Sequence, residues 1–145
     1  MPQRPEHLTP QWQPIDKLPV IAYAIDGMLE SAEEQYPTLE KARPRPHMLD
    51  DYTVGRVVEV YTEQRDDLWL YEEQLRRWSV QALTAAQRRE VERLTGQLGR
   101  LRAVIDKILA LMDELKGGTI EKMLAKSDLE VGLEMLTRLV RERER

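Results

Sequence analysis

The chain contains no cysteine, only two histidines and no long hydrophobic run. The absence of cysteine excludes disulfide bonds and thiolate metal sites, but it does not identify the compartment, because many cytosolic proteins also lack cysteine. The longest apolar run, from Leu18 to Ile25, includes Pro19 and is far shorter than the roughly 20 residues that cross a bilayer. The sequence therefore predicts no transmembrane helix and no membrane partner.

The residue types that carry most enzyme chemistry are scarce. The only histidines, His7 and His47, lie in proline-flanked loops, and no Glu-x-x-His pair of the kind found in di-iron bundles is present. Neither histidine is placed by spacing to activate any of the three serines, Ser31, Ser79 and Ser127. The chain also lacks a glycine-rich phosphate loop. We therefore expect no enzyme activity, no metal site, no cofactor and no small-molecule substrate.

Two runs of apolar residues spaced alternately by three and four dominate what is present. The first stripe is Val54, Val57, Tyr61, Gln64, Leu68, Tyr71, Leu75 and Trp78. The second stripe is Val91, Leu94, Leu98, Leu101, Ile105, Ile108, Met112 and Leu115. This spacing keeps one narrow face of a helix against a partner helix, as in coiled coils. Both segments are therefore predicted to be long helices that pack on another helix.

The two stripes match one another as an antiparallel pair. Their residue numbers add to 169 in every layer, from Val54 with Leu115 to Trp78 with Val91, which places a turn near residue 84. Thr84 followed by Gln87 forms a capping-box pattern at that point. We therefore predict an all-α fold, a helical bundle built on a long antiparallel coiled-coil-like hairpin of residues 50–82 and 84–116. Gln64 is the only polar residue of the stripes, and it falls opposite Ile105.

The segment before the hairpin is rich in proline. Residues 1–15 hold four prolines and are predicted to be an extended arm. An N-terminal helix follows over residues 17–35, with Asp16 as its N-cap and Pro37 expected to end it. Residues 36–49 then form a Pro-rich connector, and Asp50 is expected to cap the first arm of the hairpin.

The segment after the hairpin is predicted to form two further helices. Gly117 and Gly118 are expected to stop the hairpin with a left-handed residue, and Thr119 can cap a helix over residues 119–126. Ser127 opens a capping-box pattern for a last helix over residues 128–143. Its apolar face consists of Leu129, Leu133, Leu136 and Val140. Both the N-terminal and the C-terminal helices are expected to pack along the Gly117 end of the hairpin, so that residues 1–145 form a single domain.

This architecture favours a non-catalytic interaction or assembly protein. Trp69 and Leu70 lie off the first stripe and need a partner inside or outside the chain. A row of small residues on the second arm of the hairpin could admit another helix: Gly96, Gly99, Ala103 and Ala110. We therefore predict a homo-oligomer, most simply a dimer. The N-terminus has no apolar segment behind its charges, so that a secretory signal is not expected and a cytoplasmic location follows.

The alternative is a regulator that binds nucleic acid. Five arginines near the hairpin tip could form a basic stripe: Arg88, Arg89, Arg93, Arg100 and Arg102. Against this alternative stand a pI near 5.3 and an acidic opposite arm that could neutralise the stripe. Binding to phosphates weakens steeply with salt, whereas an apolar protein interface does not, so salt dependence separates the two functions.

Overall fold

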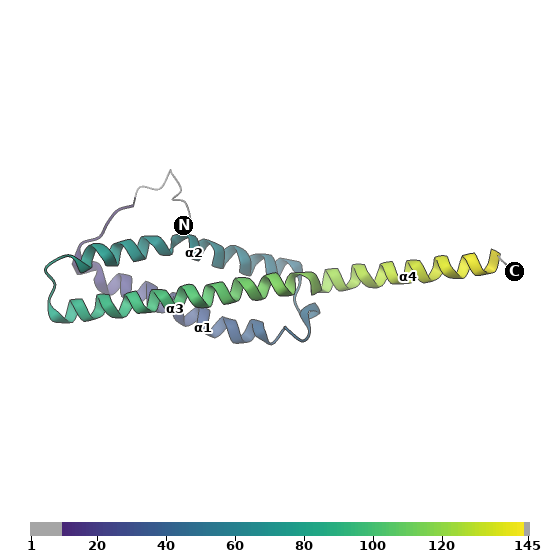
Figure 1. Ribbon diagram of the computed structural model, residues 1–145, viewed down its shortest axis with the longest axis horizontal. Coiled ribbons are helices and arrows are strands. Elements are labelled where there is room, and N and C mark those ends of the chain that lie inside the picture. Colours follow the sequence, from purple (N-terminus) through teal and green to yellow (C-terminus); the bar gives the residue numbers. More distant parts are fainter. Residues whose placement is uncertain (1–9, 144–145) are drawn as a thin grey trace.

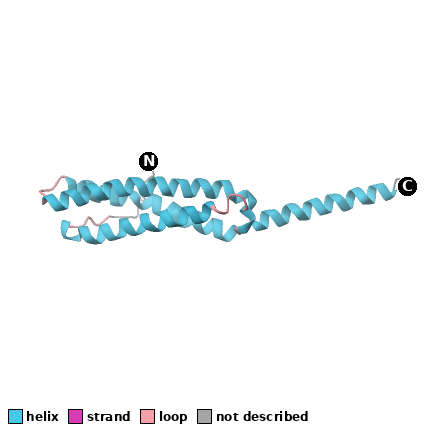
Figure 2. Cartoon of the chain, turned by 90° about the horizontal axis from the view of Figure 1, so that it is seen from below, coloured by secondary structure: helices cyan, strands magenta, loops and turns pink. Residues whose placement is uncertain are grey.

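The computed structural model describes residues 10–143, and every regular element in that range is helical (Figure 1). The all-α fold class is confirmed. Three helices lie side by side as a bundle, and the fourth extends beyond them in both views (Figure 2). The α-helices are α1 (Leu18–Glu40), α2 (Asp51–Ser79), α3 (Ala85–Leu115) and α4 (Ile120–Arg143). Three short 3₁₀ helices accompany them: η1 (Ile15–Lys17), η2 (Pro46–Met48) and η3 (Lys116–Gly118).

The antiparallel hairpin forms from α2 and α3, as the sequence predicts. All eight residues of the second stripe are buried. In the first stripe only Gln64 and Tyr71 remain half-buried. The opposite directions of the two helices bring Glu72 of α2 to Arg102 of α3, which form an ion pair. The three-and-four spacing therefore identifies the faces that build the centre of the bundle.

The predicted helix caps form at the start of each arm of the hairpin. The Thr84 hydroxyl accepts a hydrogen bond from the Gln87 N–H at 3.1 Å, and the Gln87 side chain accepts one from the Thr84 N–H at 2.9 Å. At the start of α2, the Asp50 carboxylate accepts a hydrogen bond from the Thr53 N–H at 2.6 Å. Hydrogen bonding to Thr53 lowers the pKa of Asp50. Each cap satisfies backbone donors that a helix end leaves open.

Helix α1 completes the bundle by running parallel to α3 along most of its length. Its core face buries Ile25, Leu29 and Ala32, and this face is wide enough to contact two helices. Polar contacts follow the edges, since Asp26 and Glu33 of α1 pair with successive arginines of α3. The N-terminal helix therefore packs along the hairpin as a third full member.

Two predictions about α1, its end and its N-cap, are wrong. The helix does not end before Pro37 at residue 35, but continues through it to Glu40. Burial of Leu39 and Ala42 in the core offsets the backbone hydrogen bond that a proline removes. The last turn of α1, a run of turns and η2 occupy most of residues 36–49, the predicted Pro-rich connector. Asp16 is not an N-cap either, since it lies inside η1.

The prediction of two C-terminal helices that pack on the hairpin is also wrong. Gly117 and Gly118 continue α3 as η3, and no glycine in the described range has a positive φ. One helix, α4, then replaces the expected helices of 119–126 and 128–143, and Ser127 lies inside it instead of capping it. Without a left-handed stop the chain is not turned back, and α4 leaves the bundle along the general direction of α3 (Figure 1).

Two glutamines of α2 have opposite hydrogen-bonding states. The Gln64 Oε1 is buried and has no hydrogen-bond partner among the described residues, and α1 does not supply the polar group that could have satisfied it. Gln74 is also buried, but its side-chain oxygen accepts from the Gln13 N–H at 2.7 Å and its Nε2 donates to the Gln13 carbonyl at 3.3 Å. A glutamine side chain therefore weakens the bundle at position 64, where its oxygen has no partner, and stabilises it at position 74, where it binds the arm.

Replacing Gln64 by leucine should stabilise the protein. Gln64→Leu removes a buried acceptor without a partner, and we expect the free energy of unfolding to rise by about 1 kcal/mol in urea titrations followed by circular dichroism. The matched control is Gln74→Leu, which leaves the Gln13 N–H without its acceptor and should lower the same quantity by about 1 to 3 kcal/mol. Destabilisation by both substitutions would contradict the description of Gln64 as a buried acceptor without a hydrogen-bond partner.

Candidate interaction surfaces

The start of α4 is fixed to the start of α2. The Ile120 N–H donates to the Leu49 carbonyl at 2.8 Å, and the fully buried Thr119 donates its hydroxyl to the Asp51 carboxylate at 2.6 Å. In return, the Asp51 N–H donates to the Glu121 carboxylate at 2.9 Å. Lys122 lies 3.5 Å from the same aspartate. These contacts set the direction in which α4 leaves the bundle.

Beyond this junction α4 has no partner among the described residues. None of its residues from Ile120 to Arg143 is buried. The exposed large apolar side chains are Ile120, Met123, Leu124, Leu129, Val131, Leu133, Met135, Leu136, Leu139 and Val140. Monomeric proteins rarely leave so much contiguous apolar surface in water, and patches of this kind mark interaction sites. Helix α4 is therefore the largest unpartnered apolar element of the described chain.

The apolar residues of α4 form two rows. The α4 stripe, defined as Leu129, Leu133, Leu136 and Val140, repeats the three-and-four spacing of the second stripe. Counting on from Leu115 by the same alternation reaches Thr119, Lys122, Lys126 and then Leu129. A second row lies on the other side of the helix at helical spacing: Leu124, Val131, Met135 and Leu139. Helix α4 therefore resembles the bundle helices in its pattern but lacks a helix to pack against.

The charges of α4 are divided along its length. Its middle carries Asp128, Glu130 and Glu134, and the end of the described range carries three arginines and one acid. The arginines are Arg138, Arg141 and Arg143. Among described residues, no salt bridge involves any of these groups. The middle of α4 is therefore acidic and its C-terminal end is basic.

The N-terminal arm covers Trp69, one of the two predicted interface residues on α2. The indole of Trp12 meets that of Trp69 edge-on, with ring centroids 6.4 Å apart and planes at 76°. The guanidinium carbon of Arg77 lies 4.4 Å from the Trp12 ring centre, within the range of a cation–π interaction. The Trp78 Nε1 donates to the Gln13 carbonyl at 2.9 Å. Trp69 thus finds a partner inside the chain.

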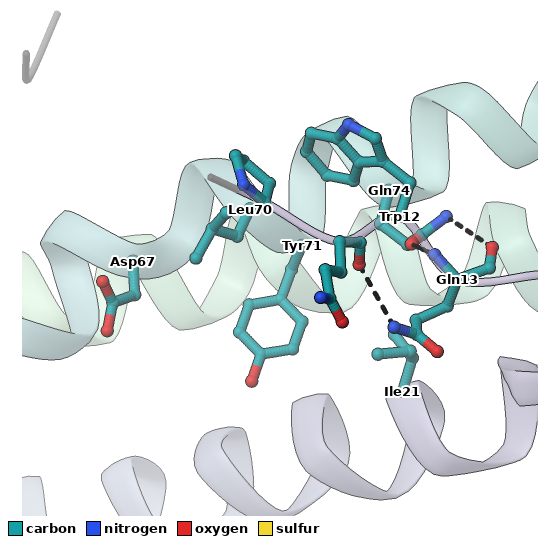
Figure 3. Close-up of a pocket in the computed structure, with 9 residues that line it drawn as sticks. Trp12, Gln13, Ile21, Asp67, Leu70, Tyr71 and Gln74 are labelled. Carbon is teal, nitrogen blue, oxygen red and sulfur yellow. Dashed lines mark hydrogen bonds between the residues drawn. The ribbon is translucent and has the colours of Figure 1, made fainter. Parts of the chain in front are cut away.

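Leu70, the other predicted interface residue, lines a pocket between the arm, α1 and α2. Figure 3 shows Leu70 and Tyr71 on one side of the pocket and Trp12, Gln13 and Gln74 on the other. The pocket has a volume of about 430 Å³. Burial is the main cause that raises the pKa of Tyr71, and the negative charge of Asp67 raises it further. The walls of the pocket are largely apolar. The sequence did not predict this pocket, because the arm has no periodic pattern.

The proposed arginine stripe is largely engaged within the chain. Arg93 pairs with Asp26 and Glu90 at 2.8 and 2.6 Å. Hydrogen bonds from Arg93 lower the pKa of Asp26 and of Glu90, and the two carboxylates raise the pKa of Arg93. Glu33 and Glu72 pair with the next two arginines along the stripe, Arg100 and Arg102.

The remaining two arginines of the stripe, Arg88 and Arg89, lie near the hairpin turn. Arg88 donates to the carbonyls of Ser79 and Gln81 at 3.3 and 3.2 Å. Arg89 is exposed, and no contact of its side chain is described. The stripe therefore lies on one helix as predicted, but acids of α1, α2 and α3 neutralise its centre, and the nucleic-acid interface stays a prediction.

The row of small residues on α3 faces away from the core. Gly96, Gly99, Ala103 and Ala110 are all exposed. A Cβ atom added at Gly96 or Gly99 would have no neighbour within 4 Å. The described chain therefore leaves this row open, and its use by another helix stays a prediction.

Other classes of site find no support in the described range. No group of three acidic or histidine side chains between residues 10 and 143 could hold a metal ion. His7, which lies among residues 1–9, and Arg145 fall outside that range. No helix described here is long and apolar enough to cross a membrane.

Comparison with known protein families, with curated proteins and with solved structures finds no match for the chain. The function is therefore argued from the geometry of the chain itself.

The two glycines that precede α4, Gly117 and Gly118, allow the packing against Pro46 to be tested with a matched control. A Cβ atom at Gly118 would lie 2.7 Å from the Pro46 Cβ, whereas one at Gly117 would meet nothing within 4 Å. Gly118→Ala should therefore lower the free energy of unfolding by about 1 to 3 kcal/mol through overpacking. Gly117→Ala should raise it by about 0.4 to 1 kcal/mol by restricting the unfolded chain. Thermal unfolding compares the two variants, and equal effects would contradict the close packing at Pro46.

Proposed function

We propose that the protein is a non-catalytic assembly protein that associates with itself through α4. The observation that supports this proposal is a 24-residue helix without a buried residue and with apolar residues on two of its sides. The three-helix bundle would act as a rigid base, and the junction at Thr119 would hold the helix away from that base.

The energetics favour a partner for this helix. Complete burial of one Leu or Val side chain contributes about 1.5 to 3 kcal/mol, and the α4 stripe provides four such residues in each copy. Helices in proteins derive most of their stability from packing of an apolar face. Association must still overcome a loss of translational and rotational freedom of about 4 to 15 kcal/mol. Several α4 side chains therefore have to be buried together, which a helix–helix interface achieves.

The surface around Trp69 and the arginine stripe of α3 are weaker candidates for the interface. The arm already packs on Trp69, and the central arginines of the proposed nucleic-acid stripe already have carboxylate partners. Their ion pairs would have to open before phosphates could bind. The proposal therefore transfers the predicted homo-oligomer from the surface of α2 and α3 to α4.

Size-exclusion chromatography with light scattering tests the proposal. The intact protein should have the mass of an oligomer at low and at high salt, because an apolar interface does not depend on released counterions. Leu133→Glu places a charge in the α4 stripe and should reduce the mass to that of one chain, 17.0 kDa.

The matched control is Ser127→Glu, which adds the same charge on the polar side of α4 and should leave the oligomer intact. A wild-type protein that stays monomeric at every concentration would contradict the proposal. An oligomer that survives Leu133→Glu would place the interface elsewhere.

A further inference from the structure

The α4 stripe is symmetric about its own centre. The centre lies between Glu134 and Met135. Leu129 and Val140 are equally distant from it along the sequence, and so are Leu133 and Leu136. We infer that α4 pairs with α4 of a second copy in the antiparallel direction about this centre. The inference rests on the proposed function and adds the orientation and the register.

In this register the layers of the pair are fully apolar. Leu129 meets the partner's Val140, and Leu133 meets the partner's Leu136. Each layer then occurs twice by two-fold symmetry, as expected for a contact between two identical surfaces. All four side chains are exposed in the single chain, with 56 to 65% of their surface accessible, so that they are available for such a contact.

Charge favours the antiparallel direction. It brings the acidic middle of α4, with Asp128, Glu130 and Glu134, to the level of the partner's basic end. A parallel pair would set acidic beside acidic and basic beside basic segments, which costs stability and selects against that orientation. Only Lys126 and Glu142 run against the trend, and both lie at the ends of the paired segment.

One flank of the stripe shows the complementarity most directly. Glu130 and Arg141 lie on the same side of the α4 stripe by helical spacing, and antiparallel pairing turns this side toward the same side of the partner. Glu130 then lies within two residues of the level of the partner's Arg141, an axial offset of about 3 Å at 1.5 Å per residue. The pair can form twice, once on each side of the two-fold axis.

The junction leaves room for this arrangement. In the proposed register the partner's Arg143 reaches the level of Lys126, six residues short of the first residue of α4. This distance is about 9 Å at 1.5 Å per residue. The partner helix therefore ends before it meets the bundle, and the two bundles lie at opposite ends of the helix pair.

Disulfide cross-linking of the full-length chain tests the orientation, because the natural sequence has no cysteine. Leu129→Cys and Val140→Cys are made separately, one of them with an affinity tag that changes its mobility on a gel. Each is incubated in a glutathione redox buffer, alone and mixed with the other. Cysteines join only when their Cα atoms lie within about 7 Å. Antiparallel pairing predicts a cross-link between the two variants in the mixture and little cross-linking of either variant alone.

The controls separate this inference from the proposed function. Gly96→Cys lies on the exposed face of α3 and should not cross-link, and circular dichroism should show unchanged helix content in all variants. Efficient cross-linking of each variant with itself would overturn the antiparallel direction but would preserve an α4 interface. An oligomer without any of these cross-links would overturn the register. A wild-type monomer in light scattering would instead contradict the proposed function.

Discussion

Burial of the second stripe between two other helices is the constraint on which the rest of the structure depends. Helix α3 contributes nine buried apolar side chains, the eight of the second stripe and Leu111, and both α1 and α2 pack against it. Their carboxylates then meet its arginines along the edges. Because α3 already has two partners, its buried stripe is not available to α4. The apolar side chains of α4 lie beyond this arrangement, and none of them is buried.

The N-terminal arm and α4 are attached to opposite ends of the bundle in different ways. At one end, hydrogen bonds that Gln13 makes with Gln74 and Trp78, together with the contact between Trp12 and Trp69, hold the extended arm on α2. At the other end, Thr119 and Asp51 fasten only the first turn of α4. One segment thus covers apolar surface and the other presents it. A rigid base with one exposed amphipathic helix is well suited to assembly.

The hairpin could be predicted because its signals are local. Spacing by three and four identifies helix faces, and Thr84 with Gln87 marks the turn from four residues of sequence. The position of α4 could not be predicted in this way, since an apolar face shows that a helix needs a partner but not which one. The role of Gln74 was missed for a related reason. Its partner, Gln13, is 61 residues away in a segment without periodic pattern.

Hydrogen–deuterium exchange at several protein concentrations tests the central claim most directly. Amides of the bundle should be protected to the same degree at every concentration, because their hydrogen bonds depend on contacts within one chain. Amides of residues 124–143 should become more protected as the concentration rises, because packing against a second copy stabilises α4. Protection of α4 that does not change with concentration would contradict the claim that another copy of the chain holds this helix.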